Sequence, residues 1–223
     1  MLISTPDAPR VARALVSLGA VRIAMEQPFF YTSGWASPVY VDAHVLMSDV
    51  ELRTDVMDMA AQAIASIIAS SGINAIVGSE SSGIAFAAWL AERLGLPMLY
   101  LRKRPVGWGM AAQIEGRLPD RARVLLVDDV TTDGRSKAGA VAALRQAGPV
   151  VEDVFVLLDY ALYTQEARKV GGHRLNLHAL ASWRHLHEAL VESGRLDARQ
   201  TRTLEDFAAA PVQWSITHGG TGA

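Results

Sequence analysis

The feature that most constrains the fold lies just past the middle of the chain, in the run VLLVDDVTTDGRS over residues 124–136. Its four leading apolar residues are typical of a buried parallel strand, and Ala138–Ala147 has the composition of a following helix. A turn that joins such a strand to a helix leaves backbone N–H groups free to bind an anion. The run therefore predicts an α/β protein with an anion site between this strand and this helix.

The side chains of the run indicate what the anion belongs to. Gly134 supplies the backbone freedom that a tight turn needs, and hydroxyl donors flank it at Thr131, Thr132 and Ser136. Asp128 and Asp129, at the predicted end of the strand, can accept hydrogen bonds from vicinal sugar hydroxyls or lie near a hard cation such as Mg²⁺. The pattern favours a ribose phosphate site.

Three other interpretations of the run compete with a ribose phosphate site. A nucleotide hydrolase would need a G-x-x-x-x-G-K-[ST] loop upstream, which the sequence lacks. A receiver domain would carry its paired acids after the first strand, early in the chain. A capped helix in an α/β protein with no ligand remains as the third possibility.

Two further segments turn this pattern into a family resemblance. Residues 124–136 resemble the phosphoribosyl diphosphate (PRPP) signature of type I phosphoribosyltransferases, and TSGWASPVYVD at residues 32–42 is similar to the K-S-G-x-x-S-P-x-Y segment of orotate phosphoribosyltransferases. Arg102 and Lys103, with the residues up to Gly116, resemble the mobile catalytic loop of the same enzymes. The resemblance extends from about Phe29 to Asp159.

The resemblance implies a fold, a reaction and an assembly. The expected fold is the type I phosphoribosyltransferase fold, a central and mostly parallel sheet flanked by helices with a small N-terminal hood. The implied reaction is Mg²⁺-dependent conversion of orotate and PRPP to orotidine 5'-monophosphate and diphosphate, in pyrimidine (UMP) biosynthesis. Members of the family work as homodimers in which loop cations reach the neighbouring subunit's site.

The resemblance also implies roles for particular residues. Arg102, Lys103 and Asp129 are the expected catalytic residues, and Asp128 and Asp129 the indirect Mg²⁺ ligands. The turn 78–83, GSESSG, would hold the diphosphate. The expected PRPP-binding residues are Ser81, Ser82, Asp128, Asp129, Val130, Thr131, Thr132, Asp133, Gly134, Arg135 and Ser136. The base would contact Tyr40, Val41 and Thr132.

Five positions depart from the family pattern. Family members usually carry Lys at positions 32, 82 and 106, His at 108 and Arg at 160, where this chain has Thr32, Ser82, Val106, Trp108 and Tyr160. Loss of one donor to developing charge costs on the order of 10²–10³ in rate. The alternative function is therefore a regulatory PRPP-binding paralogue, or an enzyme that uses another base.

Other groups in the chain offer partial compensation for these changes. The candidate cations are Arg104, Arg117, Lys137 and His44, each of which we expect at the surface rather than in the site. Trp108, between two glycines, is expected to act as an apolar lid. Backbone N–H groups near Tyr40 and Val41 would then hold the base carboxylate. The pair His185 and His187 has no further partners in a metal-ligand pattern.

Composition excludes several classes of protein. The chain of 223 residues has a net charge of −2 and no cysteine, which gives no general attraction to nucleic acid or membranes and excludes disulfides and thiolate chemistry. The longest apolar region, residues 84–101, contains charges, Gly95 and Pro97, so no membrane span is expected. Without a signal sequence in residues 1–20, the expectation is a soluble, cytoplasmic protein.

The periodicity of the sequence predicts alternating strands and helices in three parts. The parts are residues 1–45, an N-terminal helix and hood strands, here called the hood; residues 46–180, the core; and residues 181–223, C-terminal helices and a tail. We expect strands at 29–41 (a pair), 75–78, 98–101, 124–127, 151–158 and 175–180. The expected helices are 6–18, 48–71 with a capping box at Ser48 and Glu51, 83–94, 138–147, 164–170, 183–191 and 198–208. Residues 218–223 are expected to fray.

Overall fold

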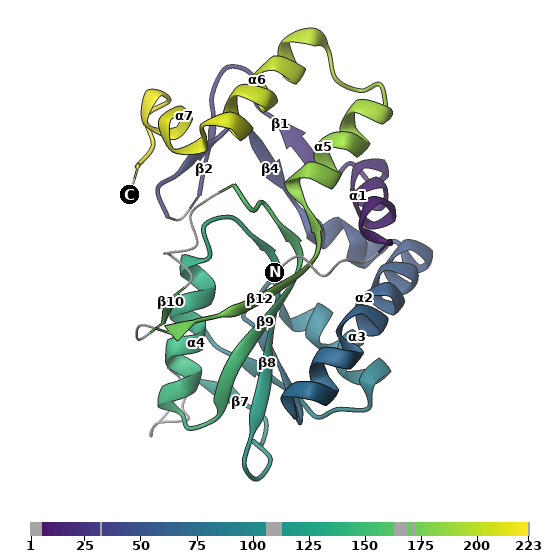
Figure 1. The fold of residues 1–223 in the computed structure, drawn as a ribbon, viewed down its shortest axis with the longest axis vertical. Coiled ribbons are helices and arrows are strands. Elements are labelled where there is room, and N and C mark those ends of the chain that lie inside the picture. Colours follow the sequence, from purple (N-terminus) through teal and green to yellow (C-terminus); the bar gives the residue numbers. More distant parts are fainter. Residues whose placement is uncertain (1–5, 32, 106–112, 163–168, 171–172, 223) are drawn as a thin grey trace.

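A central sheet of six strands organises the protein (Figure 1). The computed structural model describes residues 6–31, 33–105, 113–162, 169–170 and 173–222. Across the sheet the strand order is β12-β9-β8-β5-β6-β7, and all neighbours are parallel except β6 and β7. The strands are β5 (Ala75–Ser79), β6 (Met98–Leu101), β7 (Ile114–Glu115), β8 (Arg123–Thr131), β9 (Val150–Asp159) and β12 (Asn176–Ser182). The predicted fold class is confirmed.

Helices cover both faces of this sheet, as a parallel sheet requires. Figure 1 shows α2 (Val50–Ser71) and α3 (Ile84–Leu94) on one face and α4 (Arg135–Gln146) on the other. The apolar strand residues are buried on each side, with Phe155 and Leu125 in the core under α2 and α3 and Val154 and Leu126 in the core under α4. The sheet is thus fixed between two apolar layers, and its carboxyl edge is left to carry the site.

The boundaries of the core helices follow local backbone chemistry. Left-handed glycines at Gly72 and Gly95, each with φ of 63°, end α2 and α3. The predicted capping box at Ser48 is wrong, because Asp49 is the N-cap and accepts a hydrogen bond from the Leu52 N–H at 2.9 Å. Ser48 instead ends a 3-10 helix, η1 (Ala43–Ser48).

The signature segment also differs from its predicted boundaries. Strand β8 runs through both aspartates to Thr131, and α4 begins at Arg135, three residues earlier than predicted. The ladder with β9 continues to Thr131 and Asp159, so backbone pairing outweighs the low strand preference of aspartate. Of the predicted helix 164–170, residues 164–168 lie outside the described part, and Lys169–Val170 is a short strand, β10, paired with β11 (His173–Arg174).

The described residues of the hood form an α-helix, two small antiparallel strand pairs and the start of η1. Helix α1 (Ala8–Ser17) is followed by β1 (Val21–Ile23), which pairs with β4 (Val39–Val41), and by β2 (Phe29–Phe30), which pairs with β3 (Ala36–Ser37). The expected pair within residues 29–41 is present as β2 and β3, whereas the pairing of β4 with β1 was not predicted. These strands hold residues 30–44 above the carboxyl edge of the sheet.

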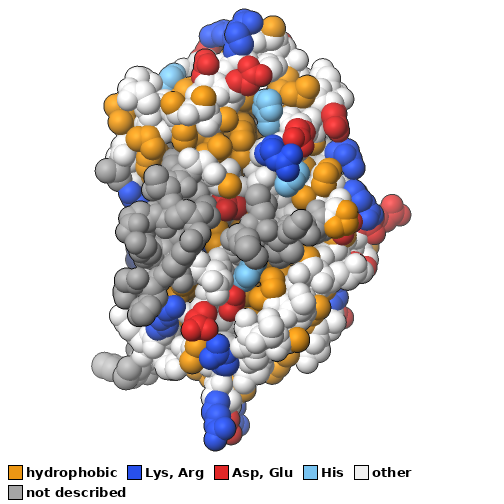
Figure 2. All heavy atoms as spheres, viewed as in Figure 1, with side chains coloured by type: hydrophobic (Ala, Val, Ile, Leu, Met, Phe, Trp, Pro, Cys, Tyr) orange, Lys and Arg blue, Asp and Glu red, His pale blue; other side chains and the backbone are white. Residues whose placement is uncertain are grey.

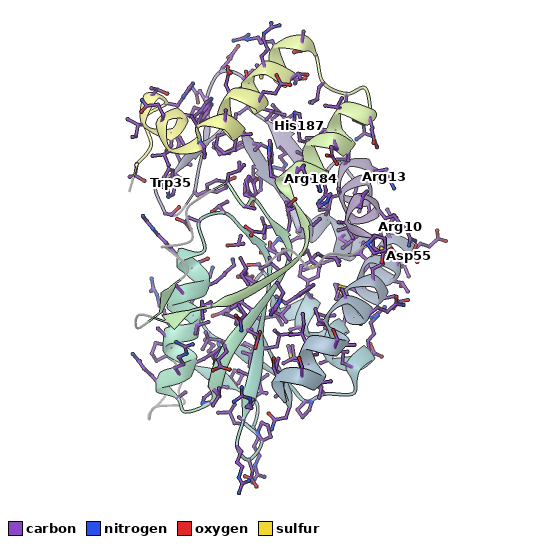
Figure 3. The ribbon with its side chains drawn as sticks, viewed as in Figure 1. Arg10, Arg13, Trp35, Asp55, Arg184 and His187 are labelled. Carbon is purple, nitrogen blue, oxygen red and sulfur yellow. The ribbon has the colours of Figure 1, made fainter. Side chains whose placement is uncertain are left out.

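Helices from the end of the chain pack against the hood. They are α5 (Trp183–Glu192), α6 (Ala198–Ala209) and α7 (Pro211–Thr217). Figure 1 shows α5 beside α1, and Arg13 of α1 lies 3.7 Å from Glu192 of α5; Figure 3 labels Arg13 and Arg184 on this helix pair. Figure 2 shows apolar surface gathered near α6 and α7, where Val212 and Ile216 are exposed.

The expectation of a frayed tail is wrong for residues 218–222. The Thr221 N–H donates to the Gly34 carbonyl at 2.9 Å, and the Ser215 hydroxyl donates to the Thr221 carbonyl and accepts from the Ala36 N–H. These bonds fix the tail to the hood next to Trp35, which Figure 3 places beside α7. No described helix is both long and apolar enough to cross a bilayer.

Candidate active site

A cavity of about 710 Å³ lies where the hood meets the carboxyl ends of the parallel strands. This edge is where open α/β sheets usually bind ligands. We call it the main cavity. Its lining comes from five places in the sequence: Phe30, Tyr31, Ser33, Tyr40, Val41 and His44; Ser81 and Ser82; Lys103; Asp129, Val130, Thr131, Thr132, Asp133, Arg135, Ser136 and Lys137; and Tyr160. Most of the predicted site residues are thus brought together.

The turn between β8 and α4 forms an anion cradle at one end of this cavity. Gly134 is the N-cap of α4 and adopts φ of 84°, a conformation that favours glycine. The Asp133 carboxylate accepts a hydrogen bond from the Arg135 N–H at 3.0 Å. The first N–H groups of α4 therefore face a turn whose shape is fixed, which suits a phosphate group.

Two buried polar oxygens of this turn have no hydrogen-bond partner among the described residues, although the Arg135 guanidinium lies 3.6 Å from one of them. They are Oγ1 of Thr131 and Oδ2 of Asp133, and their residues are only 2% and 6% exposed. Unsatisfied polar groups of this kind are costly and concentrate where a ligand binds. Thr131 lines the main cavity, so its hydroxyl is available as a donor to a bound phosphate.

The two aspartates of β8 have different environments because successive strand residues point to opposite faces. Asp129 lines the main cavity, whereas Asp128 lines a second cavity of about 370 Å³. Asp128 Oδ1 accepts from the Asp129 N–H at 3.1 Å, and its Oδ2 lies 2.7 Å from the Lys137 ammonium. Both oxygens of Asp128 are therefore engaged, while Asp129 is turned to the ligand space.

Asp129 has a perturbed acidity. Burial, together with the charge of Asp128, raises the pKa of its carboxyl above the usual range, although Lys137 and His44 act in the opposite direction. His44 lies between two acids, with Nε2 3.8 Å from Asp129 and Nδ1 3.4 Å from Asp42. A carboxylate held in this way is a strong acceptor for hydroxyl groups of a bound sugar.

The turn after β5 is built mainly from backbone. A Cβ atom on Gly83 would lie 2.1 Å from the Val127 carbonyl oxygen and 2.7 Å from the Ser79 nitrogen, so only glycine fits. The peptide between Glu80 and Ser81 is cis. Ser82 lines both cavities, and Ser81 lines the main one. The turn packs directly on β8 and places two hydroxyls opposite the phosphate cradle.

The loop cations divide between the two cavities. Lys103 lines both, and its N–H donates to Glu80 Oε2 at 2.6 Å. Arg102 lines the second cavity and forms an ion pair with Glu115 at 2.6 Å, which raises its pKa further. Arg104 and Arg117 are exposed, as expected. The substituted positions Val106 and Trp108, and Thr32 of the hood, lie outside the described residues.

Aromatic side chains form the hood side of the main cavity. Tyr160, which is 1% exposed, has its hydroxyl 3.0 Å from that of Tyr31, and the Tyr31 hydroxyl donates to the Val39 carbonyl at 2.8 Å. Burial raises the pKa of Tyr31, and burial followed by the charges of Asp42 and Asp129 raises that of Tyr40. This end of the cavity is lined by neutral phenols.

Two expectations about cations need correction. Lys137 is not at the surface: it is 7% exposed and paired with Asp128. His44 is half-buried and lines the main cavity. Sequence reasoning also missed Phe30, Tyr31 and Ser33 as lining residues. Ser33 belongs to the TSG segment itself, and Phe30 and Tyr31 directly precede that segment, just as Lys137 directly follows Ser136 of the signature.

The comparisons agree with this geometry. The model of the family described as "Phosphoribosyl transferase domain" matches residues 50–170. An orotate phosphoribosyltransferase of Sinorhizobium medicae is 40% identical over 213 residues, 96% of this chain and 92% of that protein.

Solved structures give the same result. The crystal structure of orotate phosphoribosyltransferase from Aeropyrum pernix superposes with a TM-score of 0.64 at 30% identity, covering 84% of this chain and 99% of that one. The structure of Leishmania donovani UMP synthase has a TM-score of 0.72 at 24% identity, covers 91% of this chain and 42% of that one, and shows the shared fold. With identity sustained over nearly its whole length, the chain belongs to the orotate phosphoribosyltransferases of the phosphoribosyl transferase domain family.

Proposed function

We propose that the protein transfers the 5-phosphoribosyl group of PRPP to orotate. The bond between the anomeric carbon and the diphosphate oxygen breaks, a ring nitrogen of orotate bonds to that carbon and releases its proton, and orotidine 5'-monophosphate and diphosphate are the products. The main cavity carries this proposal, because it joins a phosphate cradle, an acceptor for sugar hydroxyls, a second hydroxyl-bearing turn and an aromatic wall in one space.

The phosphate end is the best defined part of the proposed site. The 5-phosphate would lie in the β8–α4 turn, held by helix N–H groups and by hydroxyl donors. The residues assigned to it are Val130, Thr131, Thr132, Asp133, Gly134, Arg135 and Ser136. Asp129 would accept hydrogen bonds from the ribose hydroxyls and fix the anomeric carbon for attack.

At the opposite end, the protein's task is to stabilise charge on the departing diphosphate. No nucleophilic side chain is required, because the sugar carbon becomes cation-like as the leaving group departs. Ser81 and Ser82 would donate to the diphosphate, and Lys103, with Arg102 behind it, would balance its charge. The ion pair of Arg102 with Glu115 holds that side chain in place at 2.6 Å.

Mg²⁺ fits the donors present at one aspartate better than at the other. This ion takes oxygen ligands and is often held by one or two carboxylates together with substrate phosphates. Asp129 faces the cavity, whereas both oxygens of Asp128 are engaged by Lys137 and by a backbone N–H. We therefore assign the metal to Asp129 and substrate oxygens. When bound, the ion would neutralise part of the diphosphate charge.

The base is assigned to the hood side. Tyr40, Val41 and Thr132 would contact the ring, next to the hydroxyl pair of Tyr31 and Tyr160. Neutral phenols at this position can donate or accept hydrogen bonds without adding charge.

As part of the same proposal, the active assembly is a cytoplasmic homodimer whose loops are contributed in trans.

The direct test is product formation by the purified protein. We expect orotidine 5'-monophosphate and diphosphate to form from orotate, PRPP and Mg²⁺, with little product from uracil, which lacks the carboxylate. Asp129→Asn should lower kcat/KM about 10²-fold or more, whereas Asp120→Asn, a change at an exposed acid, should not. PRPP binding without turnover of any base would contradict the proposal and indicate a regulatory protein.

A further inference from the structure

The two cavities share four lining residues, and these have the chemistry of an anion site. Ser82, Lys103, Ser136 and Lys137 line both the main and the second cavity. Two of them are hydroxyl donors and two carry ammonium groups. The junction between the cavities therefore combines donors and positive charge at the place where the turn after β5 faces the start of α4.

Lys137 differs from the other cation at this junction in how firmly it is held. It lies in the first turn of α4, is only 7% exposed, and contacts Asp128 at 2.7 Å. Lys103 is exposed and follows a strand into the loop. A charge fixed before the reaction stabilises a developing anion without reorganisation, which is the favourable case for catalysis.

Pairing with Asp128 leaves N–H donors of the Lys137 ammonium group available for a ligand. An ammonium group carries three N–H donors, and among the described residues its one charged partner is Asp128. A buried ion pair is also a poor device for stability alone, because well-packed apolar residues often serve as well or better. A lysine that is buried, anchored and open to both cavities is better explained by an anionic ligand.

We propose that Lys137 is a diphosphate-binding residue of this enzyme, anchored by Asp128 at the junction of the two cavities. This inference rests on the proposed function. The family-typical lysine is absent at Ser82, and helix α4 supplies a positive charge to the same space from the opposite wall. The ammonium donates to diphosphate oxygens while these accept charge from the breaking bond, and Asp128 keeps it aligned.

The test compares two ligands by calorimetry on the full-length protein. Inorganic diphosphate with Mg²⁺ probes the junction, and ribose 5-phosphate probes the β8–α4 turn. In Lys137→Met we expect diphosphate affinity to fall about 10- to 100-fold, as for loss of a charged hydrogen bond, and ribose 5-phosphate affinity to change less than about twofold. Arg184→Met, which removes an exposed cation of α5, is the control for net charge.

A second variant separates ligand binding from simple charge balance. Asp128→Asn combined with Lys137→Met leaves no unpaired buried acid, so it carries the test if the single variant does not fold. The same loss of diphosphate affinity is expected. Diphosphate binding at the level of the wild type in the double variant, or equal losses for both ligands, would overturn the inference.

The two proposals fail in different ways. If the wild type binds diphosphate through Lys137 but makes no orotidine 5'-monophosphate, the assignment of the reaction is wrong and that of Lys137 stands. If product forms normally and Lys137→Met binds diphosphate like the wild type, only the assignment of Lys137 is wrong. Lys137→Arg, which keeps the charge, should retain more kcat than Lys137→Met if the charge itself is what matters.

Discussion

The two ends of the central sheet shift the pKa values of aspartate side chains in opposite directions. Near the amino end, Asp153 of β9 forms a 2.7 Å contact with His178 of β12. Burial opposes its ionisation, but hydrogen bonding and attraction from His178, with further hydrogen bonds, outweigh burial and lower its pKa. At the carboxyl end, Asp129 of β8 is partly buried beside Asp128, and its pKa is raised by burial and by the charge of Asp128.

This contrast shows where the protein gives up stability for its site. The amino half contains satisfied pairs, such as Arg123 with Glu152 at 2.8 Å and the Asn74 side chain with the Arg123 N–H at 2.9 Å. At the carboxyl end, Oγ1 of Thr131 and Oδ2 of Asp133 lack hydrogen-bond partners among the described residues. A site that must bind a charged ligand cannot satisfy all its polar groups beforehand, so polar groups without hydrogen bonds remain there.

The largest expected effect tests whether the carboxyl end is rigid as well as polar. Gly83→Ala would place a Cβ atom against backbone of β8 and of the preceding turn, where neither side can move easily. We expect a loss of about 3 kcal/mol or more in the free energy of unfolding, measured by urea denaturation. In the control, Gly139→Ala on α4, nothing lies within 4 Å of the new atom, so stability should stay level or rise by up to about 1 kcal/mol. Equal behaviour of the two variants would show that the turn adapts.

An intermediate loss of stability is expected near the amino end of the sheet. Asp153→Asn removes a charged hydrogen bond to His178 and should cost about 1–3 kcal/mol near pH 7. Because the folded pKa of Asp153 is lowered, its stabilisation is complete above the unfolded value of about 3.9 and is lost as the pH falls through the folded pKa. The difference in unfolding free energy between wild type and variant should thus shrink below about pH 4. A difference that stays constant down to pH 2 would contradict this.

The smallest expected effect is a gain in stability rather than a loss. Asp129→Asn removes a buried negative charge and should raise stability by about 1 kcal/mol, or about 2–4 °C in Tm, at pH 7. Since the folded pKa of Asp129 is raised, the cost of its charge is present at neutral pH and disappears as the pH falls through that pKa toward the unfolded value. The gain should therefore vanish in acid, as calorimetry at pH 7 and pH 4 would show. If Asp129→Asn were less stable than the wild type at pH 7, the charge of Asp129 would stabilise the fold as that of Asp153 does, which would contradict the prediction.

Much of the core could be predicted because its signals are local. Apolar runs bounded by glycine gave β6 at residues 98–101 and the ends of α2 and α3 at Gly72 and Gly95. The signature residues likewise predicted a turn after β8 and a helix beyond it. Such features depend on neighbours in the sequence, which periodicity and turn chemistry can describe.

The errors concern contacts between distant segments. Nothing near Lys137 in the sequence shows that its ammonium is buried against β8, because lysine is ordinarily exposed. The pairing of β1 with β4 and the attachment of Thr221 to Gly34 likewise join residues far apart in the chain. The hood side of the main cavity depends on the same kind of contact, Tyr31 with Tyr160, and so this hydroxyl pair was not predicted.

The attachment of residues 215–221 to the hood has a consequence for how the protein is made. During translation, residues 50–182 emerge before α7 and contain every strand of the central sheet. The sheet can therefore form on the ribosome, whereas the β2–β3 pair gains its bonds to Ser215 and Thr221 only after residues 215–221 have been synthesised. The hood side of the main cavity is consequently completed after the sheet, which separates its assembly in time from that of the turn between β8 and α4.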